Sequence, residues 1–113
     1  MKVIRFRHDY YKLQEETFTT IRGKRFLRWI DVDVGDVIRI KSPSYDFFAR
    51  IIDVQYKRIC DIPIELLKKD AEFEGFEIKT HEDFVRLINS FTRWKNTKLT
   101  TEKAIIYLKK VNI

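Results

Sequence analysis

The sequence has little cysteine, glycine or proline and contains no long hydrophobic run. Its single cysteine, Cys60, excludes an internal disulfide and a zinc site built on paired thiols, so we expect a small core residue beside Ile59. No apolar stretch approaches the roughly 18 residues that a membrane span needs. The first seven residues alternate charged with hydrophobic side chains, unlike a signal segment. We therefore expect a cytoplasmic protein that does not interact with membranes.

The length of the chain favours one domain. With 113 residues, 44% of them hydrophobic, it can bury one core but is too short for two ordinary domains. Three glycines and two prolines leave no obvious linker, so we expect residues 1–113 to form a single domain. His8 and His81 stand apart from any metal-ligand spacing, and we expect neither a metal nor a cofactor. The oligomeric state is left open.

The net charge of +6 is unevenly distributed along the chain. Residues 1–60 carry 13 basic and 8 acidic side chains, residues 61–83 carry 3 and 8, and residues 84–113 carry 7 and 1. This segregation suits a protein that presents one face to phosphate groups. The alternative is a heat-adapted chain with many surface ion pairs, which explains the abundance of charge but not its segregation.

Alternation of apolar and polar side chains predicts five strands, over residues 2–7, 17–22, 37–41, 47–59 and 104–110. The fourth is long enough that we expect a bend or bulge to divide it. A short helix is predicted over residues 9–14, whereas residues 23–36 appear irregular up to the turn before the third strand.

Two longer helices are predicted between the fourth and fifth strands. The first opens at Asp61 and Pro63 and ends at Gly75, and the second opens with a capping box of Thr80 and Asp83. Strands followed by helices and one final strand predict an α+β fold dominated by antiparallel pairing.

Four short motifs follow one another in an order and spacing that resemble the ASCH domain family over nearly the whole chain. They are Thr19-Thr20-Ile21-Arg22, Val34-Gly35-Asp36, the segment from Asp70 to Phe76, and Glu82-Asp83-Phe84. The resemblance implies a PUA-like twisted antiparallel β-barrel with two or three flanking helices. It also implies a cleft associated with RNA binding, which in some members hydrolyses the acyl group of an acetylated cytidine nucleoside.

In those hydrolases a threonine, a lysine three residues before it and a carboxylate act together. The resemblance places the threonine at Thr20 and the carboxylate at Glu74, but the lysine position falls on Thr17. Because a threonine hydroxyl is a poor nucleophile without a neighbouring base, this departure argues against catalysis. Lys12 or Lys24 would have to reach the cleft from a different backbone position. An acyl-nucleoside hydrolase or a metal-independent ribonuclease using Thr20 and Glu74 is thus the alternative function.

Basic and aromatic side chains alternate just after the Thr-Ile-Arg motif. Such a mixture suits phosphate contacts and stacking on unpaired bases. The four basic residues are Arg22, Lys24, Arg25 and Arg28, and the rings are Phe26 and Trp29. The alternative is a solvated basic loop with both rings in the core. Arg22 shares a strand face with Thr20, and an enclosed arginine needs an anion, which is either a ligand phosphate or Glu74.

We therefore predict a basic cleft that binds RNA or a nucleotide fragment. Its phosphate contacts are Arg22, Lys24, Arg25 and Arg28, with Thr20, Trp29 and Glu74 completing the nucleic-acid-binding residues. A second basic segment, residues 93–98, joins this site only if the fold brings the two together. A third alternative is a protein-interaction adaptor that uses the acidic residues 61–83.

Overall fold

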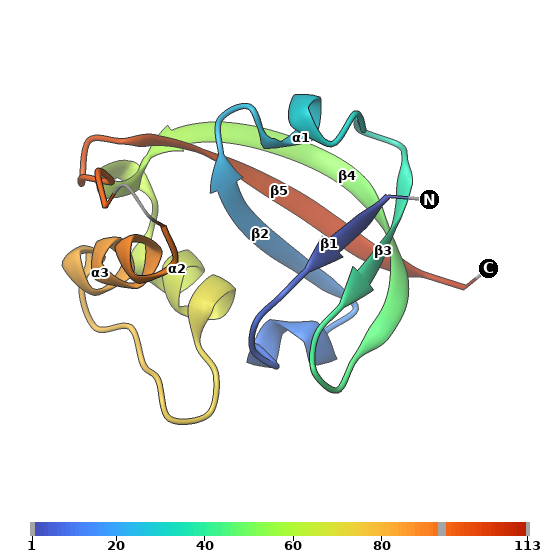
Figure 1. Ribbon diagram of the computed structural model, residues 1–113, viewed down its shortest axis with the longest axis horizontal. Helices are drawn as coiled ribbons and strands as arrows, with labels where there is room; N and C mark the ends of the chain where they lie inside the picture. The colour runs from blue at the N-terminus through green and yellow to red at the C-terminus, as the bar shows by residue number, and fades with distance from the viewer. Residues whose placement is uncertain (1, 93–94, 113) are drawn as a thin grey trace.

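A computed structural model shows one mixed five-stranded sheet with helices packed at one end, and it describes residues 2–92 and 95–112 (Figure 1). The strands are β1 (Val3–Arg5), β2 (Thr17–Gly23), β3 (Val37–Lys41), β4 (Asp46–Arg58) and β5 (Glu102–Val111). Their order in the sheet is β1-β3-β4-β5-β2, with β1 parallel to β3 and every other pair antiparallel. The predicted α+β class and the dominance of antiparallel pairing are confirmed.

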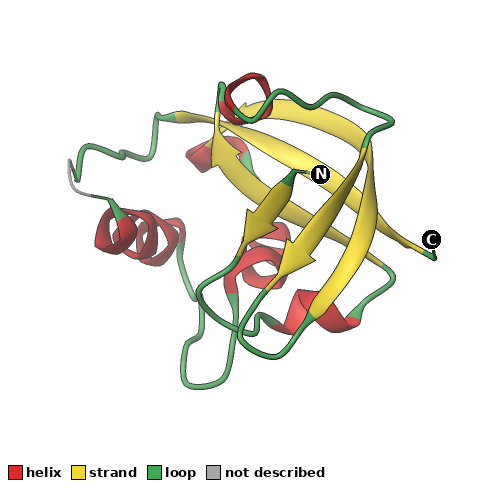
Figure 2. Cartoon of the chain, turned by 45° about the vertical axis from the view of Figure 1, so that its right-hand side comes forward, coloured by secondary structure: helices red, strands yellow, loops and turns green. Residues whose placement is uncertain are grey.

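The sheet is strongly curved but does not close. β1 and β2 are its edge strands (Figure 2), and no backbone pairing within the described residues joins them. Side-chain contact replaces pairing there: Arg22 Nη2 donates to the carbonyl of Arg5 at 3.4 Å. The closed barrel that the resemblance implied is therefore not found. Residues of both edge strands line a cavity instead.

The long strand β4 contains the predicted irregularity. Its register against β5 shifts between Ile51 and Asp53, and the residue between them, Ile52, is exposed. A bulge of this kind increases the local twist and bends the strand. It lets one strand follow the curve of the whole sheet.

Five helical segments accompany the strands. They are the 3₁₀ turns η1 (Tyr11–Gln14) and η2 (Ile59–Asp61), and the helices α1 (Phe26–Trp29), α2 (Ile64–Ala71) and α3 (His81–Phe91). The predicted capping box is confirmed, because Thr80 Oγ1 accepts from the Asp83 N–H and the Asp83 carboxylate accepts from the Thr80 N–H. Within the described residues, no helix has both the length and the apolarity to cross a membrane.

Two predictions about these segments were wrong. The helix after Pro63 ends at Ala71, because Gly75, at φ +86°, lies in the turn bridged by Phe73 and Phe76. Residues 23–36 were expected to be irregular but contain the short helix α1. In the first case a turn decided the boundary, which helix periodicity does not report.

The core has two parts on opposite faces of the sheet. One fills the inside of the curved sheet and includes Ile38, Ile51 and Ile106, and the other lies between β5 and the helices and includes Ile105 and Leu67. Consecutive residues 105 and 106 serve different clusters because strand side chains alternate between faces.

The prediction that Cys60 belongs to the core was wrong. In η2 the neighbouring Ile59 and the following Ile62 are buried, whereas Cys60 is exposed. A 3₁₀ turn places residues three apart on the same side, so burying Ile59 and Ile62 turns Cys60 outward.

Candidate functional site

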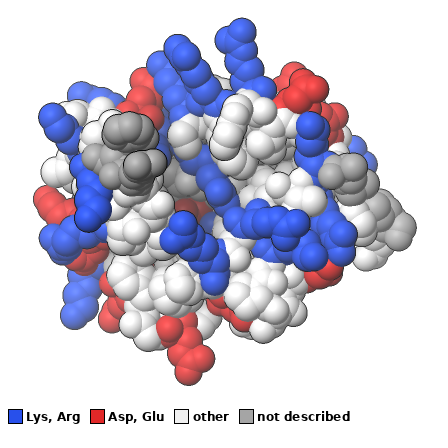
Figure 3. Space-filling model, viewed as in Figure 1, with Lys and Arg blue, Asp and Glu red and all other residues white. Residues whose placement is uncertain are grey.

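A cavity of about 300 Å³ opens between the edge strands and the helices. β1 contributes Arg5 with the following Phe6 and Arg7, β2 contributes Thr20 to Gly23, and the helices contribute Asp70 and Phe84. Figure 3 shows the surface hollowed at this place, with Lys and Arg side chains crossing the face beside it. The site therefore lies where the sheet fails to close.

Arg22 is held in this cavity by contacts that neutralise none of its charge. Its Nε donates to Thr20 Oγ1 at 2.9 Å, and its guanidinium carbon lies 5.1 Å and 5.0 Å from the ring centres of Phe6 and Phe26. Burial lowers the pKa of Arg22, with Asp70 opposing the shift. No ion pair among the described residues includes Arg22. The result is an oriented, largely enclosed cation without a carboxylate in contact.

Behind Arg22, a buried ion pair forms the floor of the cavity. Lys12 Nζ lies 3.0 Å from Asp70 Oδ1, and the two residues are only 4% and 6% exposed. Thr19, on the other face of β2 from Thr20, donates its hydroxyl to the same oxygen at 3.0 Å. Burial lowers the pKa of Lys12, although Asp70 favours the charged amine. The pair brings η1, β2 and α2 together at one point.

The charges that line the cavity are mostly positive. Its cations are Arg5, Arg7, Lys12, Arg22 and Lys103, and its carboxylate is Asp70. The pKa of Lys103 is lowered by burial and by the nearby Arg22, while burial and Asp70 raise the pKa of the Tyr10 hydroxyl. With Asp70 already bonded to Lys12, this arrangement favours an anionic ligand.

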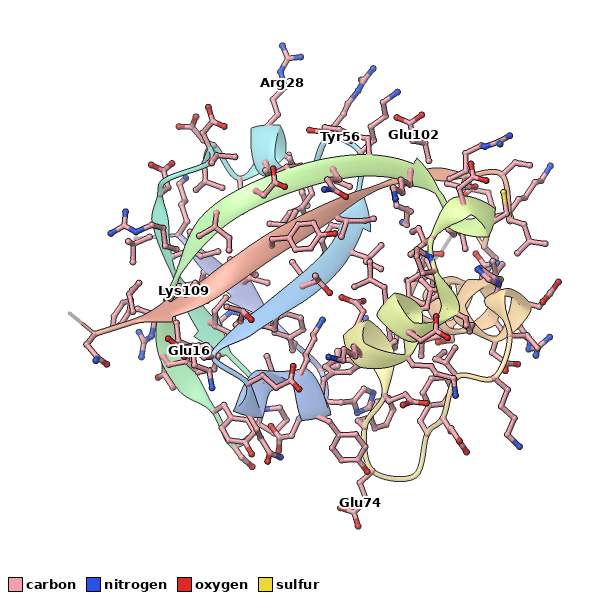
Figure 4. The ribbon with its side chains drawn as sticks, turned by 180° about the vertical axis from the view of Figure 1, so that it is seen from behind. Glu16, Arg28, Tyr56, Glu74, Glu102 and Lys109 are labelled. Atoms are coloured by element: carbon pink, nitrogen blue, oxygen red, sulfur yellow. The ribbon has the colours of Figure 1, made fainter. Side chains whose placement is uncertain are left out.

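The predicted residues Thr20 and Arg22 meet in the cavity, but Glu74 does not join them. Glu74 is exposed in the loop after α2, and in Figure 4 its side chain points away from the molecule. Asp70, four residues earlier and near the end of α2, supplies the carboxylate instead. The sequence does carry a signal for it: position 70 lies three residues after Leu67 on the buried stripe of the helix, where a carboxylate needs a partner.

The lysine of the cavity also comes from an unexpected place. Thr17, at the position of the family's catalytic lysine, is exposed at the start of β2 and does not line the cavity. Lys12 enters from η1, ten residues before Arg22. Lys12 and Lys24 were the two lysines that the sequence offered for the cavity, but strand periodicity favoured neither of them.

The other predicted basic residues lie outside the cavity. Lys24 pairs with Glu102 at 3.3 Å on the surface. Arg25 directly precedes α1, and Arg28 lies within this helix. The two rings of this segment differ: Phe26 packs against the core, whereas Trp29 is 82% exposed. In the predicted second basic segment, Arg93 and Trp94 lie outside the described residues.

Metal ligation has no support in the described ranges 2–92 and 95–112. No three His, Cys, Asp or Glu side chains gather there in a way that could hold an ion. His8 stacks on Phe73 with ring centres 4.0 Å apart, and His81 Nε2 lies 2.7 Å from the Ile62 carbonyl. Both rings thus have structural contacts.

Comparison with known proteins finds a near full-length relative. An uncharacterized protein of Methanocaldococcus jannaschii is 64% identical over 108 residues, which cover 96% of this chain and 95% of the relative. No protein-family model matches the sequence. No solved structure matches it.

Proposed function

The chain belongs to the same family as the Methanocaldococcus jannaschii protein, and we propose that its cavity binds a nucleotide, either free, chemically modified or as a unit of RNA. The observation that carries this proposal is Arg22. Arg22 is partly buried, and no carboxylate among the described residues pairs with it, so an anion would complete the site at a place where desolvated positive charge is costly. Its planar fork of donors matches two oxygens of a phosphate.

The rest of the cavity supports a ligand with both charge and a flat ring. Lys103, Arg5 and Arg7 add positive charge around Arg22, while the largely buried rings of Phe6 and Tyr10 give part of the wall an apolar, aromatic character. The Tyr10 hydroxyl, whose pKa is raised by burial, can donate a hydrogen bond to a base or sugar. A volume of about 300 Å³ lies at the lower end of small-molecule sites, as one nucleotide requires.

We also propose that the curved sheet is an open form of the PUA-like fold and that the ASCH resemblance extends to the site. In support, Thr20 and Arg22 of the Thr-Ile-Arg strand both line the cavity. This assignment requires two residues of the site to come from positions other than those of the family motif. Asp70 takes the place expected for Glu74, and Lys12 takes the place of the missing lysine at Thr17.

Titration with nucleoside monophosphates tests the binding proposal. We expect Arg22→Ala to weaken binding of uridine or cytidine monophosphate at low salt by about 10- to 100-fold, since a charge-assisted hydrogen bond contributes about 1.5–3 kcal/mol. Arg22→Lys should recover only part of it, because an ammonium group lacks the planar fork. Calorimetry or ligand-observed NMR measures both.

Lys109→Ala is the matched control. Lys109 is exposed on β5, six residues beyond Lys103 and thus about 20 Å along the strand. The substitution removes one positive charge far from the cavity and should leave the affinity for the monophosphate nearly unchanged. Equal losses from Arg22→Ala and Lys109→Ala would remove Arg22 from the site and would contradict the proposal.

A second function, hydrolysis of an acylated nucleoside, is favoured by one observation. The amine of Lys12 enters the same cavity as the hydroxyl of Thr20. Burial lowers the pKa of Lys12, which favours the neutral amine that a general base requires. Against it, Lys12 is bonded to Asp70 and Thr20 Oγ1 already accepts from Arg22. For this reason we rank binding first.

Incubation with acetylcytidine distinguishes the two functions. The binding proposal expects no release of cytidine and acetate from the wild type, measured by chromatography. Turnover that is lost in Thr20→Val but retained in Glu74→Ala would make hydrolysis the primary function, with Asp70 as its carboxylate. Glu74→Ala is a suitable control because it alters an exposed acid outside the cavity.

A further inference from the structure

A surface groove lies next to the cavity at the ends of two strands. Gly23 and Lys103 are paired across β2 and β5, and both line the cavity. Their chain neighbours, Lys24 and Glu102, line a groove of about 350 Å³ together with side chains of α1 and β4. The groove therefore begins one residue along each strand from the cavity.

The groove itself carries more positive than negative charge and one exposed ring, whereas an adjoining groove that shares Arg28 and Tyr56 with it is lined by Asp31, Asp33 and Asp36. Lys24, Arg25 and Arg28 oppose the single carboxylate Glu102 among the residues that line it. Tyr56 lines it as well and is 53% exposed. Figure 4 shows Arg28, Tyr56 and Glu102 along the same edge of the molecule, far from Glu74. We call these residues, together with Trp29, which belongs to α1 but does not line the groove, the α1 surface: Lys24, Arg25, Arg28, Trp29, Tyr56 and Glu102.

Trp29 is the least expected feature of the α1 surface. It is 82% exposed on a helix of four residues, none of them buried. A tryptophan is usually largely buried, so its exposure leaves a large aromatic face that the fold does not use. Exposed rings among arginines and lysines match a ligand that repeats both a negative charge and a flat base.

From these observations, and resting on the proposed function of the cavity, we propose that the bound nucleotide is one unit of a single-stranded polynucleotide whose chain crosses the α1 surface. Arg25 and Arg28 contact its phosphates, and Trp29 and Tyr56 stack on its bases. Aromatic stacking tolerates any base, while basic side chains follow the backbone. Glu102 opposes the strand and holds Lys24 back from it.

Binding of a labelled hexanucleotide, compared with binding of the mononucleotide, tests this inference. We expect uridine hexanucleotide to bind at least tenfold more tightly than uridine monophosphate to the wild type in fluorescence anisotropy and competition. Trp29→Ala should weaken binding of the hexanucleotide by roughly tenfold, since one stacked base contributes that much. Arg28→Ala should weaken it by roughly tenfold as well, because it removes a charge-assisted contact to a phosphate. Neither should change affinity for the monophosphate, because both side chains lie outside the cavity.

Two further variants sharpen the test. Glu102→Gln should strengthen hexanucleotide binding, because it removes the opposing charge and frees Lys24. Arg28→Ala should reduce the slope of log affinity against log salt by about 0.7, as expected for one lost phosphate contact to a single strand. Lys109→Ala, at the other end of β5, should neither strengthen binding of the hexanucleotide nor reduce the salt slope. A deoxythymidine hexanucleotide compared with the RNA tells which sugar the site prefers.

The outcomes separate this inference from the proposed function. If the hexanucleotide binds no more tightly than the monophosphate, or if its affinity does not depend on Trp29 and Arg28, the α1 surface is not a binding site. The proposed function of the cavity is unaffected by that result. If Arg22→Ala leaves the affinity for the monophosphate unchanged, the proposed function of the cavity is wrong, even if the affinity for the hexanucleotide still depends on Trp29. Equal competition by polyglutamate, or Trp29-dependent binding to phosphatidylserine vesicles, would replace the polynucleotide by an acidic protein or a membrane surface.

Discussion

Replacing Lys12 with methionine is expected to lower the free energy of unfolding by about 3–5 kcal/mol, the usual cost of removing one partner from a buried ion pair. Lys12 and Asp70 are both almost fully buried, and methionine leaves the carboxylate with only the Thr19 hydroxyl as a side-chain partner. Equilibrium unfolding in guanidinium chloride, with the midpoint and slope compared to wild type, measures the loss.

The control is the double variant Lys12→Met/Asp70→Leu. Replacing both charges with apolar groups removes the uncompensated carboxylate, so most of the stability should return. A single variant that costs less than about 1 kcal/mol, or a double variant that is worse than either single one, would contradict a buried pair at this point.

The same substitution has a defined effect at alkaline pH. Burial lowers the pKa of Lys12 below that of a lysine in the unfolded chain. Between those two values the unfolded state binds more protons than the folded state, so the contribution of Lys12 to the free energy of unfolding rises with pH. Lys12→Met should remove this rise, seen as the difference between wild-type and variant stability curves over that interval.

Replacing Phe84 with alanine is expected to lower the free energy of unfolding by about 3–5 kcal/mol, as for other buried aromatic side chains. Phe84 is 1% exposed and is the one side chain of α3 that is buried. It packs in the cluster between β5 and the helices and also forms part of the cavity wall. Its loss removes these apolar contacts and enlarges the neighbouring cavity.

Glu82→Ala, two residues earlier on the same helix, is the appropriate comparison. Glu82 is exposed in the first turn, where a negative side chain stabilises the helix by less than about 1 kcal/mol. Thermal and guanidinium unfolding of the two variants should therefore differ by several kcal/mol. If they were equal, α3 would not be held to the sheet by Phe84.

The faces of the strands followed directly from period-two alternation. Val37–Lys41 has the predicted bounds, with Ile38 and Ile40 buried and their neighbours partly exposed. Phe18, Thr20 and Arg22 share the predicted face of β2, and the last two meet in the cavity. Such assignments succeed because a strand turns each successive side chain to the opposite face, whatever its partners.

The carboxylate of the site was not predicted, and neither was the open edge of the sheet. Glu74 matches the family motif, but the helix ends at Ala71 and the following turn directs Glu74 into solvent. A motif specifies residue order, whereas the direction of a side chain after a helix depends on where the helix stops. Sheet closure likewise depends on pairing between β1 and β2, which local pattern does not specify.

By itself, then, the sequence determined the α+β class, the faces of the strands, the capping box at Thr80 and the placement of Thr20 beside Arg22. These depend on residues a few positions apart, where backbone geometry alone sets the side-chain directions. Only the tertiary structure decided that Lys12 meets Asp70, that no described carboxylate pairs with Arg22, and that Trp29 stays outside the cavity. Lys12 and Asp70 are separated by 58 positions, and their contact depends on how η1 and α2 pack against β2.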